Sequence, residues 1–122
     1  MDTPKTLKEC FDALDNMDVV DSIRWLAMNE TQALAQAHHG FGTTLRNNWG
    51  LWDENSELYK YFKEMGLFHA DDMSSVILKS YHRYKNGKDQ KIDEQIKRYQ
   101  EYWADMNKSK GNSFEPADDI LY

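Results

Sequence analysis

Residues 29–49 read NETQALAQAHHGFGTTLRNNW, and this stretch sets the fold class. Its apolar positions are Leu34, Ala37, Phe41, Leu45 and Trp49. They recur every three or four residues, which is the period of one face of an α-helix. Asn29 followed by Gln32 has the form of a capping box at a helix start. The pattern therefore predicts one helix that begins after Asn29 and that Gly50 ends.

Other segments show the same helical period. They cover about residues 6–16, 18–26, 56–65, 71–85 and 89–107. The two prolines, Pro4 and Pro116, leave the chain between them free of that helix breaker, and no stretch alternates like a strand. We therefore predict an all-α protein, a single compact bundle of five or six helices over residues 1–108. An acidic, flexible C-terminal tail over residues 109–122 is expected to follow it.

Composition and charge narrow the class of protein. Hydrophobic residues make up 40% of the 122 residues, enough for one folded domain. The net charge of −6 argues against a nucleic-acid partner and favours a basic protein partner. The single cysteine, Cys10, and the lack of a long apolar run predict a cytoplasmic protein that does not enter membranes. No motif predicts a metal or a cofactor.

Gly42 lies on the flank of the predicted helix, between His39 and Arg46. Three alternatives account for a glycine there. A second helix packs closely over it, the helix breaks at Gly40–Gly42, or a ligand groove opens. We favour the first, with the helix that begins at Asp71–Asp72 filling the gap. On the same helical wheel His38 belongs to the buried face.

A set of polar side chains is the candidate for either a polar pocket or a structural lock. Its members are His39, Arg46, Asn47, His69, Asp71, Asp72 and Arg83. The two aspartates also suit the first turn of a helix, where the dipole stabilises negative charge. Alternatively, one of them pairs with Arg46 and joins two helices. His82 is expected to be exposed, because the helical wheel places it opposite Met73.

Large aromatic side chains exceed the needs of so small a core. Those proposed as interface anchors are Trp25, Trp52, Tyr61 and Tyr102. Tryptophan and tyrosine are common anchors of protein interfaces. The alternative, which we favour, is that they separate the helices and complete the core.

Three motifs resemble a small bacterial and phage family of unknown function. They are HGFGTTLRNNWGLW at 39–52, GLFHADDMS at 66–74 and SYHRYKNG at 80–87. The family pattern is similar to HGxGxxIRNxWGLW, GIxHPDDMS and SYHRxLNG, and the resemblance covers residues 31–105. Ala70 stands where the family tends to have proline. The resemblance implies an all-α domain and supplies no activity.

These features favour a small acidic, non-enzymatic interaction module that binds a larger protein, of the inhibitor, immunity or anti-defence type. The alternative is a ligand-binding or enzymatic pocket built from His39, Arg46, Asp71 and Asp72. Self-association of the helical domain is a third possibility. A structure separates the first two, because a pocket requires the four side chains to converge on an open concavity.

Overall fold

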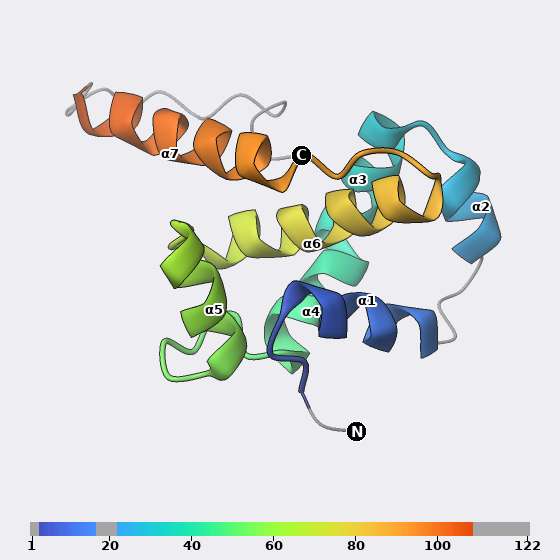
Figure 1. The fold of residues 1–122 in the computed structure, drawn as a ribbon, viewed down its shortest axis with the longest axis horizontal. Helices are drawn as coiled ribbons and strands as arrows, with labels where there is room; N and C mark the ends of the chain where they lie inside the picture. Colours follow the sequence, from blue (N-terminus) through green and yellow to red (C-terminus); the bar gives the residue numbers. More distant parts are fainter. Residues whose placement is uncertain (1–2, 17–21, 109–122) are drawn as a thin grey trace.

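The computed structural model describes residues 3–16 and 22–108, and the regular secondary structure of this part of the chain is all α-helix. The helices are α1 (Leu7–Asn16), α2 (Ser22–Ala27), α3 (Glu30–His39), α4 (Phe41–Asn48), α5 (Glu57–Met65), α6 (Ala70–Lys85) and α7 (Ile92–Lys108) (Figure 1). The predicted all-α fold is confirmed. The described residues form seven helices and not five or six, because the predicted helix over 29–49 is divided in two.

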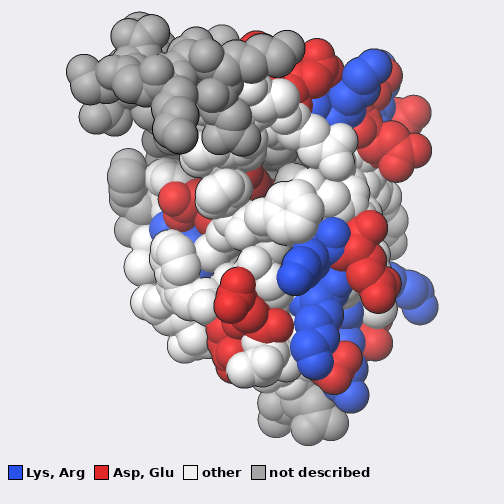
Figure 2. Space-filling view, turned by 90° about the vertical axis from the view of Figure 1, so that its left-hand side faces the viewer, with Lys and Arg blue, Asp and Glu red and all other residues white. Residues whose placement is uncertain are grey.

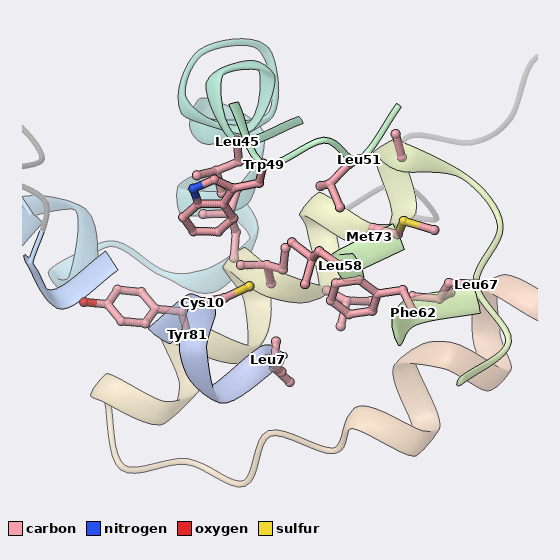
Figure 3. Packing of buried hydrophobic residues seen from close by; sticks show 14 of the residues in the cluster. Leu7, Cys10, Leu45, Trp49, Leu51, Leu58, Phe62, Leu67, Met73 and Tyr81 are labelled. Carbon is pink, nitrogen blue, oxygen red and sulfur yellow. The ribbon is translucent and has the colours of Figure 1, made fainter. Parts of the chain in front are cut away.

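Helix α6 is the centre of the fold. It contacts α1, α3, α4 and α7, and most of its side chains are buried. Together with its neighbours it builds a core of fully buried side chains, of which Leu45, Leu58, Phe62 and Met73 are among the largest (Figure 3). Because α1, α3 and α4 on one side of the sequence and α7 on the other all pack on α6, this helix holds them in fixed positions relative to one another.

The division between α3 and α4 falls at Gly40, whose backbone angles of φ −104° and ψ −92° are not helical. The prediction of one continuous helix is therefore wrong, and the alternative of a break is correct. The apolar stripe persists across the break, since Leu34, Ala37, Leu45 and Trp49 are all buried.

Several helix ends follow the sequence signals closely. The Asn29 side chain accepts a 2.9 Å hydrogen bond from the Gln32 backbone N–H, and Ser56 Oγ accepts one of 3.1 Å from Tyr59 N–H. Gly66 ends α5 in the left-handed conformation, with φ 105°. The Leu67 N–H then donates to the Phe62 carbonyl, as in a Schellman ending.

His82 is buried, with 3% of its surface exposed, so the prediction that it is exposed is wrong. Its Nε2 lies 3.1 Å from the Met28 carbonyl, and its ring meets Trp25 edge-on at 5.0 Å. Nearby, Asn86 Nδ2 donates to the Leu26 carbonyl over 3.0 Å. A wheel assumes that only one face of a helix is covered, whereas α2 and the chain after it also cover this side of α6.

Two predictions fall outside the described residues: the start of the second helix at 18–21 and the tail over 109–122. Within the described ranges, none of the helices has the length and apolar character that a membrane crossing requires.

Candidate functional site

A groove lies between the 66–69 connection and α7. Gly66 turns the chain out of α5, and residues 67–69 lead into α6 at Ala70. Gln100 on α7 fixes this turn, because its Nε2 lies 3.4 Å from the Gly66 carbonyl oxygen that it donates to. A β-carbon on Gly66 would come within 2.1 Å of that same nitrogen. Glycine at this position therefore supplies both the turn and the close approach of α7.

The groove has a volume of about 510 Å³ and is open to solvent. Its lining residues are Gly66, Leu67, Phe68, His69, Asp72, Tyr99, Gln100, Trp103 and Ala104. Phe68 is 56% exposed, so it presents a large apolar side chain to solvent at the groove. Figure 2 shows the side of the molecule that carries α5: acidic and basic side chains crowd one edge, an acidic patch lies beside them, and much of the remaining described surface is uncharged. The groove volume is within the range of ligand-binding clefts.

Asp72 places a carboxyl group in the lining of the groove. It lies in the first turn of α6, and only 2% of its surface is exposed. Its Oδ2 accepts a 2.8 Å hydrogen bond from Trp103 Nε1. Burial raises the pKa of this carboxyl, and the Trp103 hydrogen bond and the nearby His69 only partly oppose the rise. The groove thus holds a poorly hydrated carboxyl group, and Trp103 and His69 offset only part of the free-energy cost of ionising it there.

Aromatic rings form the walls beside Asp72. The His69 imidazole stacks on the Trp103 indole, with centroids 3.9 Å apart and planes at 22°. Tyr99 is buried at the base, and its hydroxyl hydrogen-bonds with Ser75. Burial, together with the charge of Asp72, raises the pKa of the Tyr99 phenol well above its ordinary value. Tyr99 therefore stays neutral and serves as an uncharged part of the groove lining.

Replacing Asp72 by asparagine is expected to raise the free energy of unfolding at pH 7 by about 1 kcal/mol. The folded-state pKa of Asp72 is above its ordinary value, so the folded chain holds this proton more tightly than the unfolded chain. Stability from this group is therefore present at low pH and lost as pH rises through the folded pKa. Asparagine does not titrate, and its side-chain oxygen still accepts the Trp103 hydrogen bond.

Urea unfolding at pH 4 and pH 7 measures this effect. The gain from Asp72→Asn should shrink at pH 4, where the wild-type carboxyl carries its proton for more of the time. Asp93→Asn is the matched control, because Asp93 is an exposed aspartate in the first turn of α7. A gain that is equal at both pH values would contradict the assignment of a buried, charged Asp72.

Arg46 is buried in a separate place, between α3, α4 and α6. Its Nη1 donates to Ser74 Oγ over 2.8 Å, and its Nη2 donates to the His38 carbonyl over 3.1 Å and to Thr43 Oγ1 over 2.9 Å. Its Nε lies 3.3 Å from Asp71 Oδ1 in an ion pair. The His38 carbonyl is near the end of α3, so Arg46 satisfies a group that the break at Gly40 leaves without a helical partner.

Gly42 allows this arrangement. A β-carbon there would lie 3.0 Å from the Ala37 carbonyl oxygen, 3.1 Å from Arg46 Nη1 and 3.6 Å from Leu78 Cδ1 of α6. Helix α6 fills the space over Gly42, as predicted. His38 is buried, as the wheel predicted.

The predicted polar set does not converge on one concavity. Asp71 joins Arg46, whereas Asp72 and His69 face Trp103. Asn47 Oδ1 accepts a 3.0 Å hydrogen bond from Trp52 Nε1. Arg83 forms a two-point ion pair with Glu30, over 2.5 Å and 3.1 Å. The side chain of His39 lies outside the described part of the structure.

The proposed interface aromatics differ in exposure. Trp52 is 61% exposed, whereas Trp25, Tyr61 and Tyr102 are half-buried. Trp25 donates to the Ala33 carbonyl over 2.8 Å, Tyr61 contacts Phe62, and Tyr102 contacts Trp103. Of the four, Trp52 has the exposure of an anchor.

Sequence reasoning missed the groove and its aromatic residues Phe68 and Trp103. Leu67 and Phe68 follow the glycine that ends α5, where apolar residues suggest a contact with the helix, but only Leu67 is buried there. The sequence did contain a signal for Trp103, because it lies four residues after Tyr99 on the apolar stripe of α7. Nothing in the spacing showed that this stripe would face Asp72. In the described ranges, no group of three or more His, Cys, Asp or Glu side chains is placed to hold a metal ion.

Comparison with known families supplies an identification. The model of a domain of unknown function, DUF6794, matches residues 3–85. The chain belongs to this family. No curated protein and no solved structure matches the chain. The DUF6794 match begins earlier than the predicted range of 31–105 and ends with α6. One wall of the groove therefore lies within the DUF6794 region, and the other, on α7, lies beyond it.

Proposed function

We propose that this protein is a small, non-enzymatic interaction module that binds a larger protein through the groove between residues 66–69 and α7. The observation that carries the proposal is an open, aromatic-walled groove over the buried carboxylate of Asp72. Such a groove fits a cationic side chain of the partner, whose charge complements Asp72 and whose stem packs against the rings. Inhibitors and immunity proteins work by this kind of surface recognition.

Charge across the whole molecule supports a basic partner. The net charge of −6 attracts a basic surface and speeds encounter, while the groove supplies a specific contact. Exposed Phe68 gives the groove a large apolar surface that folding alone does not require. Interfaces concentrate their binding energy in such aromatic residues.

The alternative of a shared pocket from His39, Arg46, Asp71 and Asp72 gains no support from the described geometry. Arg46 is 5% exposed, and its donors face Ser74, His38 and Thr43. The Asp72 carboxylate faces Trp103 on another side of α6. The two residues therefore have different proposed roles: Arg46 holds α3, α4 and α6 together, and Asp72 recognises the partner.

The experiment uses two variants that alter the groove and preserve the fold. Ala104→Trp fills the groove from an exposed position of α7, and Phe68→Asp removes its exposed ring. Affinity capture at low salt from the organism that encodes the protein, followed by titration with the purified partner, measures binding. Each variant is expected to weaken binding at least about tenfold.

Trp52→Ala is the matched control, because Trp52 is an exposed aromatic side chain that does not line the groove. It should bind the partner within about twofold of the wild type if the groove is the docking site. Partner binding that survives both groove variants and is lost with Trp52→Ala would move the interface to the 49–56 connection and overturn the proposal.

A further inference from the structure

Several hydrogen-bond donors of the groove side chains are already engaged within the protein. Trp103 Nε1 already donates to Asp72, and Gln100 Nε2 already donates to the Gly66 carbonyl. The Tyr99 hydroxyl is engaged with Ser75. A ligand that enters the groove therefore meets the Asp72 carboxyl group and aromatic faces, and the remaining side-chain donors are those of His69 and the second N–H of Gln100. This lining suits a ligand that brings donors and positive charge.

The surroundings of Asp72 determine which cation is favoured. Asp72 is 2% exposed, and its carboxyl group lies at the edge of the Trp103 indole, whose ring stacks on His69. A cation that approaches it must give up much of its hydration shell, and its attraction to the carboxylate is strong in these poorly hydrated surroundings. A weakly hydrated cation therefore gains more from this groove than a strongly hydrated one.

We propose that the partner side chain that enters the groove is an arginine, whose planar guanidinium lies against the exposed aromatic rings and is oriented by the Asp72 carboxylate. The inference rests on the proposed function and names its ligand. A guanidinium is planar, stacks on aromatic faces and is more weakly hydrated than the ammonium of lysine. Phe68 provides the most exposed aromatic ring among the lining residues.

Three small probes test this inference on the whole protein at pH 8: the N-acetyl methylamides of arginine, lysine and citrulline. Citrulline has the shape of arginine without its charge. The ¹H–¹⁵N resonance of Trp103 Nε1 reports on the groove, because this N–H donates to Asp72. We expect saturable shifts with a dissociation constant on the order of millimolar for the arginine probe. The lysine probe should bind at least about fivefold more weakly and the citrulline probe at least about tenfold more weakly.

Asp72→Asn separates the role of charge from that of the rings. This variant keeps an acceptor for Trp103 and loses the negative charge, so the arginine and citrulline probes should bind it within about twofold of each other. Ala104→Trp should abolish the shifts. The inference is overturned if the lysine or citrulline probe binds the wild type as tightly as the arginine probe, or if Asp72→Asn keeps the full arginine preference.

The results also separate this inference from the proposed function. Loss of partner binding in Ala104→Trp, without any preference for the arginine probe, would leave the groove as the docking site and reject arginine as its ligand. An arginine preference in the isolated protein, with partner binding unchanged in Ala104→Trp, would reject the groove as the docking site.

Discussion

Replacing Arg46 by alanine is expected to lower the free energy of unfolding by about 3 kcal/mol or more. The guanidinium joins three helices through Ser74, the His38 carbonyl and Thr43, and it pairs with Asp71. Truncation leaves these groups without their donor in a region where the Arg46 side chain is only 6% exposed. It also creates a cavity at the junction of α4 and α6. Urea unfolding followed by circular dichroism measures the loss.

Two further substitutions show whether the loss comes from burial or from charge. Lys97→Ala removes a basic side chain from an exposed position of α7 and should change stability by less than about 0.5 kcal/mol. Arg46→Lys keeps the charge and loses the planar fork, so it should still cost more than the Lys97 variant. An Arg46→Ala protein as stable as the wild type would show that the buried hydrogen bonds contribute nothing net.

Replacing Gly42 by alanine is expected to destabilise the protein by about 1–3 kcal/mol. In an isolated helix the same change would stabilise by about 1 kcal/mol, because alanine is the better helix former. In this fold the new β-carbon would meet the Ala37 carbonyl oxygen at 3.0 Å and Arg46 Nη1 at 3.1 Å. The carbonyl is main chain, so α3 and α4 would have to move apart to relieve the contact. Thermal and urea unfolding both measure the change.

Gly40→Ala is the matched control for Gly42→Ala. Gly40 lies two residues earlier, and its added β-carbon would meet only the Gln36 carbonyl oxygen, at 3.8 Å. Its cost should therefore be smaller, below about 1 kcal/mol. If Gly42→Ala proved stabilising while Gly40→Ala did not, helix propensity would outweigh packing and the close contact would be more tolerant than the distances indicate.

The helices could be predicted because local rules determine them. The 3.6-residue apolar period predicts most of the helices. The capping residues Asn29, Ser56 and Gly66 predict where several of them begin or end. The break at Gly40 was harder, since the apolar stripe continues across it. Only the contacts of Arg46 with α3 and α6 show why a broken helix is stable there.

The site could be predicted only in part, because its contacts join residues far apart in the sequence. From the sequence, the two aspartates at the start of α6 have two explanations: they occupy the first turn of a helix, or one of them pairs with Arg46. The structure gives the two carboxylates different partners: Asp71 pairs with Arg46, and Asp72 accepts from Trp103, thirty-one residues later. Adjacent residues of a helix point about 100° apart, so neighbouring carboxylates readily serve two regions. Which region each faces depends on how α7 packs, and no local pattern specifies that.

The packing of α7 has a consequence for how tightly any ligand is held. Among the helices, α7 makes its principal contacts with α6 alone, and it contributes one whole wall of the groove. Local opening of α7 would separate this wall from Asp72 and remove the binding site while leaving the core around α6 folded. A ligand that touches both walls binds only the closed form, so it shifts the population toward docked α7. Affinity for the ligand and the stability of one helix pair are thus thermodynamically linked.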